Sequence, residues 1–540
     1  MQVSVQNFSA RELLALARKT ATKIAASDLA QRERLRLCKS LLTESPSSLI
    51  SKDLTDKLNR LEINEKHFWI GTFYTLLLPE TIRRDQAAYF TPPYLAQGLV
   101  QLLCDEGFNL HTHTAIDPAA GGAAFLSIIA AQMSNVGVTP EGIVKRIRGF
   151  EIDSGLARLS EALIADRIGK GVTKGSVVSV RNSLKTRDKK QYDLVIANPP
   201  FGRISSSELQ RSQWERVCHS GHVNKYAMFA DLCVRLAKPG GLIGLVLPSS
   251  FMAGPLYDRL RKFLREKGEI LTLGSVANRK DVFVDVCQDV SVLIARIGEA
   301  HQAERTVTFG RFQGFGPFKA TSALKLPIDS ARPWVASASN SGLAVGGACL
   351  ADYGAILRTG YFVWNREQDR MSKRSGKLSL PLVWAENVNP DTFCKPLSRN
   401  GRGIDFVRFD DESAAIIRTQ ALVMQRTTNN AQARRLIAAR VSPAILKKYG
   451  GFVTENHTIA ITAGDIASLK LIKLLLNSEA VDQRYRLVSG TASVSVNLLR
   501  ELDLPSPAAL RASVGKLGFT DEAVQNAYEN SLSAERLATA

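Results

Sequence analysis

The chain has few cysteines, and none of them are paired at a metal-binding spacing. No Cys-x-x-Cys occurs, which excludes the usual zinc and thiol-redox patterns. Residues 218–222 (Cys-His-Ser-Gly-His) lack a second ligand pair, whereas structural zinc usually has four ligands. We therefore expect a reduced protein without a metal. The seven cysteines are Cys38, Cys104, Cys218, Cys233, Cys287, Cys349 and Cys394.

Long apolar runs are also missing. No stretch of 18 or more apolar residues occurs, and the first residues, Met-Gln-Val-Ser-Val-Gln-Asn, lack the basic-then-apolar pattern of a signal peptide. We expect a cytoplasmic protein with no membrane partner. There is no internal repeat, and residues 1–80 hold no Pro-Asp…(Asp/Glu)-x-Lys pattern, which argues against a fused endonuclease.

Acidic residues are outnumbered. Lys and Arg total 70 against 51 Asp and Glu, giving a net charge of +19 in 540 residues, of which 45% are hydrophobic. This composition predicts a globular chain of more than one domain with a polyanionic partner. Charge alone does not choose between DNA, RNA and an acidic membrane surface.

Asn198-Pro199-Pro200-Phe201 follows the apolar run Asp-Leu-Val-Ile-Ala. This pattern suits methylation of an exocyclic amine on a planar base, whose lone pair is delocalised into the ring. The Asn198 side-chain oxygen and the Pro199 carbonyl are candidate acceptors for the two amine hydrogens, and the diproline holds that carbonyl rigid. Phe201 can stack on the base. The alternative is an ordinary Pro-rich turn after a strand.

A second motif lies upstream, in Ala-Ile-Asp-Pro-Ala-Ala-Gly-Gly-Ala-Ala-Phe-Leu at residues 115–126. A short strand ending at Asp117, a turn of small residues and a helix starting near Ala123 form the outline of a nucleotide-like cofactor site. The next predicted strand, 147–150, ends at Glu151. A carboxylate at that position is well placed to bind two ribose hydroxyls.

With these motifs the chain resembles the S-adenosylmethionine-dependent N6-adenine DNA methyltransferases with the gamma motif order, as found in type II restriction-modification systems. The resemblance covers about residues 80–300. It is carried by the segments 89–93 (Tyr-Phe-Thr-Pro-Pro), 117–126, 198–201, 238–241 (Lys-Pro-Gly-Gly), 247–251 (Leu-Pro-Ser-Ser-Phe) and 282–283 (Val-Phe).

The resemblance implies S-adenosylmethionine as cofactor, a flipped adenine as substrate and a mostly parallel, seven-stranded sheet with a reversed final strand. It implies that Phe283 stacks on the base opposite Phe201. The residues it assigns to the cofactor are Tyr89, Thr91, Pro92, Asp117, Ala119, Gly121, Glu151, Asn182 and Asn198.

The chain departs from the family pattern at two places. Ala120, Gly122 and Ala123 replace Cys, Ser and Gly of the first signature; all are small, but a positive φ at Ala123 would be strained. Asn182 replaces the Asp that receives the cofactor's adenine amino group, and an amide oxygen accepts that bond without charge assistance.

The overall class we predict is α/β: a mostly parallel, Rossmann-like methyltransferase sheet with a helical N-terminal region and a mixed α+β target-recognition domain. Strands are predicted at 114–117, 147–151, 177–181, 193–197, 242–247 and 290–297. The expected division is a helical layer over 1–80, the catalytic domain over 81–335, target recognition over 340–510 and a helical tail over 511–540.

Region 340–510 has no catalytic signature and many basic residues. Segment 356–363 resembles the opening of a target-recognition domain, and 425–429 and 490–493 resemble its later parts. We expect double-stranded DNA as partner, with a separate cognate endonuclease possible. RNA adenine methylation, a modification subunit that needs a specificity subunit, and a glutamine-modifying protein methyltransferase are the alternatives. Candidate phosphate or base contacts are Arg366, Arg370, Lys373, Arg374, Arg426, Arg434, Arg435, Lys447, Lys448, Arg484 and Arg486, of which Arg434 and Arg435 are singled out.

Overall fold

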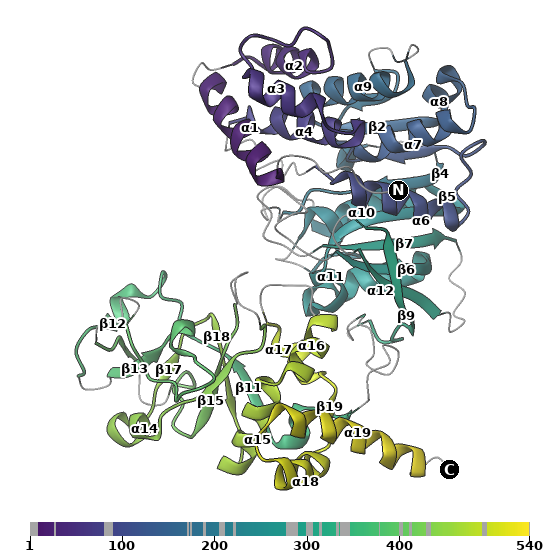
Figure 1. The fold of residues 1–540 in the computed structure, drawn as a ribbon. Helices are drawn as coiled ribbons and strands as arrows, with labels where there is room; N and C mark the ends of the chain where they lie inside the picture. The colour runs from purple at the N-terminus through teal and green to yellow at the C-terminus, as the bar shows by residue number, and fades with distance from the viewer. Residues whose placement is uncertain are drawn as a thin grey trace. The chain divides into compact units, whose positions relative to one another are not determined.

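The chain forms two compact units, Met1–Phe251 with Leu256–Ala331 and Met252–Pro255 with Arg332–Ala540 (Figure 1). The computed structural model describes residues 9–25, 29–79, 90–169, 172, 175–186, 191–202, 204, 211–219, 223–276, 290–298, 306–312, 316–330, 334, 346–376, 379–398, 403–409, 413–427, 434–488 and 494–538.

A nine-stranded sheet forms the centre of the first unit. Its order is β3-β2-β1-β4-β5-β7-β6-β8-β9. The first five strands in this order are parallel, and β7 runs antiparallel to both β5 and β6. The strands are β1 (Ala115–Asp117), β2 (Ile147–Glu151), β3 (Val178–Val180), β4 (Tyr192–Ala197), β5 (Ala237–Pro248), β6 (Gly268–Val276), β7 (Val290–Ile297), β8 (Thr306–Phe312) and β9 (Phe318–Lys325).

The six predicted strands are confirmed, but the sheet has nine strands and not the seven that we expected. β8 pairs in parallel with β6, and β9 pairs antiparallel with β8. In β8 the side chains of Val307, Phe309 and Phe312 are buried. The apolar residues of Thr-Val-Thr-Phe at its start alternate with polar ones, which is a strand signal. Burial of these side chains favours extension of the sheet beyond β6.

Helices pack on this sheet because its strands are apolar on both faces. Leu194 and Ile196 of β4 share one core with Leu99 of α6 and with Phe125 and Ile129 of α7. Such nearly continuous apolar strands are what a parallel sheet covered on both sides requires. The helices of this part are α6 (Pro93–Asp105), α7 (Ala124–Asn135), α8 (Pro140–Arg146), α9 (Ser154–Ile168), α10 (Lys225–Leu236), α11 (Ser250–Ala253) and α12 (Asp258–Lys267).

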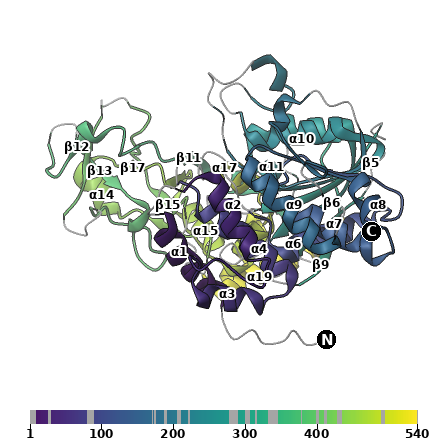
Figure 2. The same ribbon diagram turned by 90° about the horizontal axis from the view of Figure 1, so that it is seen from above.

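The N-terminal region forms helices α1 (Ala10–Ala25), α2 (Gln31–Ser40), α3 (Lys52–Asn59) and α4 (Ile63–Leu76). Of these, α2 and α4 pack against α9, and α1 and α3 pack against α4 (Figures 1 and 2). They confirm the predicted helical region. Leu13, Leu37 and Phe73 share a core with Leu156 and Leu163 of α9. The N-terminal region therefore packs on the rest of the first unit and does not fold separately from it.

The second unit holds two four-stranded sheets, ordered β11-β18-β15-β16 and β12-β14-β13-β17 (Figure 1). The strands are β11 (Ile356–Thr359), β12 (Met371–Ser372), β13 (Ser379–Val383), β14 (Phe406–Arg408), β15 (Ala421–Gln425), β16 (Ala438–Arg440), β17 (Val453–Thr454) and β18 (Thr458–Thr462), with the short pair β10 (Gly347–Ala348) and β19 (Leu504–Pro505). The mixed α+β character predicted for this region is observed.

The last helices of the chain belong to the core of the second unit. Leu510, Val524 and Tyr528 are buried with Leu469 and Ile472 of α15. A boundary at residue 510 would fall inside α18, so the structure does not set residues 511–540 apart as a tail. The helices are α14 (Pro443–Tyr449), α15 (Ile466–Leu476), α16 (Glu479–Val488), α17 (Val496–Arg500), α18 (Pro507–Leu517) and α19 (Asp521–Ala538). Of the helices that the structure describes, none has both the length and the apolar character to cross a bilayer.

Candidate cofactor and catalytic site

Asp117 ends β1 and lies beneath the turn that follows. Its Oδ1 accepts the Ala119 N–H at 2.9 Å, and only 1% of the residue is exposed. Burial raises the pKa of Asp117 to about 8, and the nearby Glu151 carboxylate adds to the rise. Through this hydrogen bond, Asp117 fixes the backbone of the turn.

The turn has two residues with positive φ, Gly121 at 49° and Ala123 at 54°. Ala123 is the one non-glycine residue with positive φ in the described part of the chain, so the strain expected at this position is present. A Cβ built on Gly121 would meet nothing nearer than the Ala119 oxygen at 3.8 Å. The space next to Gly121 is therefore open to a ligand that approaches the backbone closely.

Glu151 ends β2 and reaches the same turn. Its Oε2 accepts the Gly121 N–H at 3.0 Å, and its Oε1 accepts the Asp153 N–H at 2.9 Å. Burial raises the pKa of Glu151, while these two backbone donors oppose the rise. Hydrogen bonding to the Ile152 backbone also opposes the rise. A carboxylate has about four acceptor positions, so acceptor capacity remains for a ribose diol.

Ile152 follows Glu151 and is 58% exposed. An exposed isoleucine beside a partly buried carboxylate offers an apolar contact to the flat face of a cofactor base. The sequence analysis missed this residue. The available signal was its place directly after the acidic residue that ends β2.

Asn182 follows β3 and is exposed. Its Oδ1 accepts the Leu184 N–H at 3.1 Å and caps the short helix Ser183–Lys185. The neighbouring Ser183 Oγ donates to the Pro118 carbonyl at 2.5 Å, which ties this loop to the turn after β1. The amide oxygen proposed for the cofactor therefore already holds one backbone donor and has one lone pair left.

Asn198 follows β4, and its Nδ2 donates to Thr91 Oγ1 at 3.1 Å. Thr91 is 5% exposed and Pro92 is the N-cap of α6, so the hydroxyl sits on a rigid helix start. This bond uses one amide hydrogen and leaves the Asn198 oxygen to accept. Tyr89, expected in the same segment, lies outside the described residues.

Phe201 is partly buried and meets Tyr226 edge-on, with ring centroids 6.4 Å apart and an interplanar angle of 85°. Tyr226 in turn lies 5.8 Å from the Tyr257 ring. The Gly202 carbonyl accepts the Lys225 N–H at 2.8 Å, which anchors the end of the Asn-Pro-Pro-Phe segment to α10. Phe283, expected opposite Phe201, lies outside the described residues.

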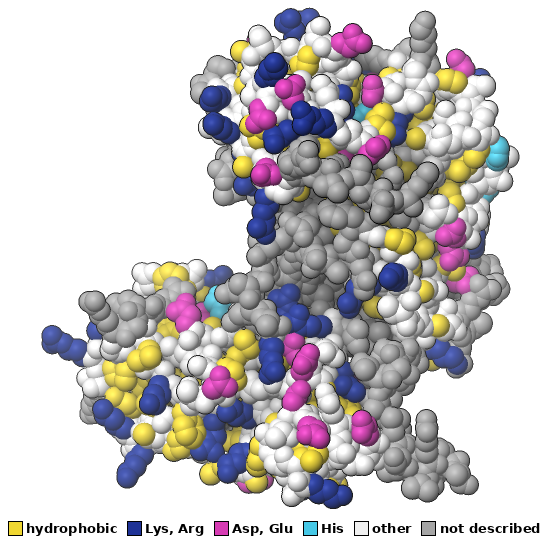
Figure 3. Space-filling view, viewed as in Figure 1, with side chains coloured by type: hydrophobic (Ala, Val, Ile, Leu, Met, Phe, Trp, Pro, Cys, Tyr) yellow, Lys and Arg dark blue, Asp and Glu magenta, His cyan; other side chains and the backbone are white. Residues whose placement is uncertain are grey.

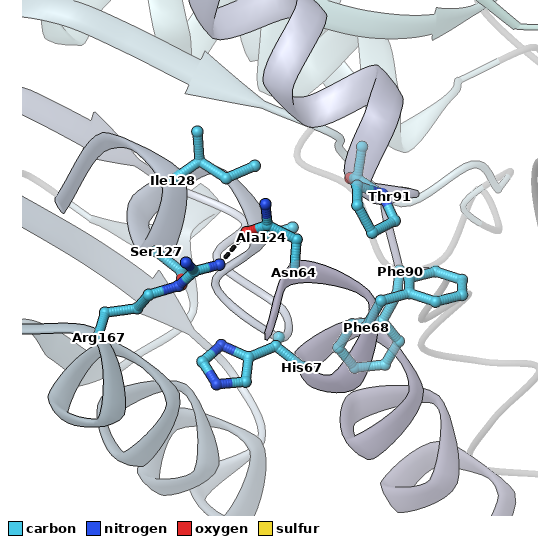
Figure 4. A pocket seen from close by; sticks show the side chains of 11 residues that line it. Asn64, His67, Phe68, Phe90, Thr91, Ala124, Ser127, Ile128 and Arg167 are labelled. Atoms are coloured by element: carbon cyan, nitrogen blue, oxygen red, sulfur yellow. Dashed lines mark hydrogen bonds between the residues drawn. The ribbon is translucent and has the colours of Figure 1, made fainter. Parts of the chain in front are cut away.

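A pocket beside this site joins the turn to the N-terminal helices (Figure 4). Arg167 of α9 donates to Asn64 Oδ1 across it and to Ser127 Oγ at 3.3 Å. The complete lining is Asn64, His67, Phe68, Phe90, Thr91, Pro93, Gly122, Ala124, Ser127, Ile128 and Arg167. Thr91 and Gly122 connect this pocket to the residues described above.

The structure divides the candidate DNA contacts of the second unit into two groups. Arg434 donates to the Asn477 carbonyl, and Arg435 is half-buried with its pKa lowered by burial and by the nearby Arg486. Exposed residues include Arg366 and Arg374, and Figure 3 shows Lys and Arg side chains over much of the visible face of this unit. Arg434 is also exposed but is engaged by this hydrogen bond, and Arg435 is partly buried, so an internal interaction competes with phosphate binding at both positions. In the described parts of both units, no three His, Cys, Asp or Glu side chains gather as metal ligands would.

Known methylases match this chain. The Eco57I restriction-modification methylase family matches residues 155–283. The type II methyltransferase M.PstI of Providencia stuartii is 22% identical over 371 residues, which are 63% of this chain and 70% of the relative. M.BsuBI of Bacillus subtilis is 23% identical over 359 residues, covering 62% and 69%.

Among solved structures, the type IIL restriction-modification enzyme MmeI in complex with DNA has a similar fold. The TM-score is 0.50 at 13% identity, over 97% of this chain and 91% of the other. The fold, the turn after β1 and the sequence matches all point to a methyltransferase. The chain is a DNA methyltransferase similar to the methylases of restriction-modification systems, and its cofactor is S-adenosylmethionine.

Proposed function

We propose that this protein methylates the N6 atom of adenine at specific sites in double-stranded DNA. The observation that carries the proposal is the Asn198 amide, fixed by Thr91 at the end of β4 with its oxygen left to accept. A cytosine ring-carbon methylase would need a nucleophile at this position, and Asn-Pro-Pro-Phe supplies only acceptors and an aromatic face.

Asn198 and Pro199 accept the two N6 hydrogens and so return the nitrogen lone pair from the ring. Phe201 stacks on the base, a contact worth about 1–3 kcal/mol. An adenine inside a duplex does not reach this edge of the sheet, so the nucleotide is flipped out. When bound, S-adenosylmethionine supplies the methyl group.

The cofactor is held at the carboxyl ends of β1, β2 and β3. Glu151 accepts the ribose hydroxyls, Ile152 contacts the adenine ring, and Asn182 accepts the adenine amino group. Ala119 and Gly121 allow the methionine part to approach the backbone. Orientation by these residues supplies most of the rate gain, and no covalent enzyme intermediate is needed.

The second unit selects the DNA site, and its exposed Lys and Arg side chains meet the phosphates. We place the protein in the cytoplasm, with a separate endonuclease of the same site specificity as a partner. The division of labour rests on the cofactor and catalytic residues, all of which lie in the first unit.

Sequencing of DNA from cells that express the protein, with chemistry sensitive to N6-methyladenine, tests this function. We expect one short sequence to be methylated throughout the genome, and none in cells that express Asn198→Ala. Methylation of RNA alone, or of DNA only after a second subunit is added, would contradict the proposal and favour one of the alternatives.

A further inference from the structure

One face of helix α4 meets the methyltransferase part of the first unit. Asn64, His67, Gly71 and Tyr74 are spaced by three, four and three residues, so they share this face. His67 Nε2 lies 2.9 Å from Asp166 Oδ2 near the end of α9, and Tyr74 reaches Asp153 at its start. We call these four residues the α4 face.

At one end, the α4 face is linked to the cofactor site by a chain of hydrogen bonds. The Tyr74 hydroxyl donates to Asp153 Oδ1 at 2.8 Å, and Gln31 Nε2 of α2 donates to Asp153 Oδ2 at 3.1 Å. The Asp153 N–H donates to Glu151 Oε1, and Glu151 Oε2 accepts from Gly121. Two residues of the N-terminal helices thus fix the turn that aims the Glu151 carboxylate.

Tyr74 is tightly packed against the start of α9. Tyr74 is completely buried, and a Cβ at Gly155 would lie 2.1 Å from its hydroxyl oxygen. Gly155 is the second residue of α9, where glycine is otherwise a poor helix former. The absence of a side chain there makes room for the tyrosine.

The α4 face also contacts Phe90, beside the turn after β1. A Cβ at Gly71 would lie 2.5 Å from Phe90 Cε1, and a Cβ at Gly122 would lie 1.8 Å from the same atom. The ring therefore lies between α4 and the turn after β1. Phe90 precedes Thr91, whose hydroxyl holds Asn198. The N-terminal helices consequently support the candidate cofactor site at two places, at Gly122 in the turn after β1 and at Glu151 at the end of β2.

We propose that the N-terminal helices are part of the cofactor site and that Tyr74 is a positioning residue, which holds Glu151 through Asp153. The inference rests on the assignment of Glu151 to the ribose made under Proposed function. Tyr74 does not touch the cofactor in this scheme. Its effect is confined to the contribution that the ribose hydroxyls make to binding.

Calorimetry on the full-length protein tests the proposal with two probes, S-adenosylhomocysteine and the same molecule without its two ribose hydroxyls. The wild type should bind the complete molecule more tightly. Tyr74→Phe should raise the Kd of the complete molecule about three- to tenfold and that of the truncated one less than twofold. Gly155→Ala, whose new Cβ displaces Tyr74, should give the same pattern.

Tyr528→Phe is the matched control, because that buried hydroxyl donates to the Asp503 carbonyl within the second unit. It should lower Tm without changing either Kd. Gln31→Leu removes the second donor to Asp153 and serves if Tyr74→Phe fails to fold. If Tyr74→Phe changes both Kd values by one factor, or changes neither, the positioning role is wrong.

Glu151→Gln separates this result from a failure of the proposed function. It should abolish most of the preference for the complete molecule. If the preference survives in Glu151→Gln, the ribose is held elsewhere and the assignment of Glu151 fails. If Glu151→Gln removes the preference but Tyr74→Phe leaves it intact, only the inference about Tyr74 is overturned.

Discussion

The two units place their functional candidates differently. In the first, Asp117, Glu151 and Asn198 are at strand ends, and each has a hydrogen bond that fixes its side chain. In the second, basic residues are spread over several loops and helices, and some of them are held by hydrogen bonds within the unit. The chemistry proposed for the first unit therefore depends on backbone positions set by the sheet, whereas the DNA binding proposed for the second unit depends on which side chains the packing leaves exposed.

The largest effect should come from Asn198→Ala. Loss of the acceptor leaves the adenine lone pair in the ring, and we expect methyl transfer to fall by at least about 100-fold, as when one preorganised hydrogen-bonding group is removed. Binding of S-adenosylhomocysteine should change little. A folded variant with near-normal turnover in a methyl-transfer assay would remove Asn198 from the mechanism.

Glu151→Ala should weaken S-adenosylmethionine binding by about 1.5–3 kcal/mol, the range for hydrogen bonds to a charged group. Glu161→Ala is a suitable control. Its buried carboxylate also accepts two backbone N–H groups, from Val177 and Val178, but these lie at the start of β3, opposite the end at which we propose the cofactor to bind. Equal losses of affinity in the two variants would show that the effect is one of stability alone.

A comparison of arginine pairs tests the second unit. Arg366→Gln with Arg374→Gln should weaken DNA binding and reduce the salt dependence by about one ion for each phosphate that the variant no longer neutralises. Arg434→Gln with Arg435→Gln should have the smaller effect on affinity and should lower Tm, because both residues interact with other groups of the unit. Filter binding at several salt concentrations measures this. The reverse ranking would restore Arg434 and Arg435 as the phosphate-binding residues.

Asp117→Asn should have the smallest effect, visible as a pH dependence of stability. Because the folded-state pKa of Asp117 is raised to about 8, its contribution to stability is complete below about pH 4 and is lost as the pH rises through 8. Without cofactor, the variant should therefore gain stability relative to wild type between pH 5 and 8.5, by at least about 1 kcal/mol.

Asp193→Asn is the control of opposite sign. Although burial works against it, hydrogen bonds from Lys238 and Thr114 hold the pKa of Asp193 at about 2. Its contribution is present above about pH 4 and is lost as the pH falls through 2, so this variant should be less stable at neutral pH. Thermal unfolding across the pH range distinguishes the two variants. A pH-independent difference for Asp117→Asn would contradict the raised pKa.

The sequence alone determined six of the nine strands of the central sheet, and it predicted a candidate site at their carboxyl ends. The continuous apolar run Leu194–Ala197 predicts a buried parallel strand, and Asp117, Glu151, Asn182 and Asn198 all lie at or just after the ends of predicted strands. In a parallel sheet the carboxyl ends of strands meet at one edge, so strand ends can be assigned to a site from local pattern. Comparison with the family signature also indicated that a positive φ at Ala123 would be strained, and φ there is 54°.

Only the tertiary structure decided how the site is supported and which basic residues are available. The bond from Asn198 to Thr91 spans 107 residues of sequence, and the bond from Tyr74 to Asp153 spans 79. Neither has a local sequence signal, because each depends on how separate helices pack. The sequence likewise does not distinguish Arg434 from Arg366. Their surroundings differ because a long cationic side chain binds whichever carbonyl or carboxylate the fold brings within reach.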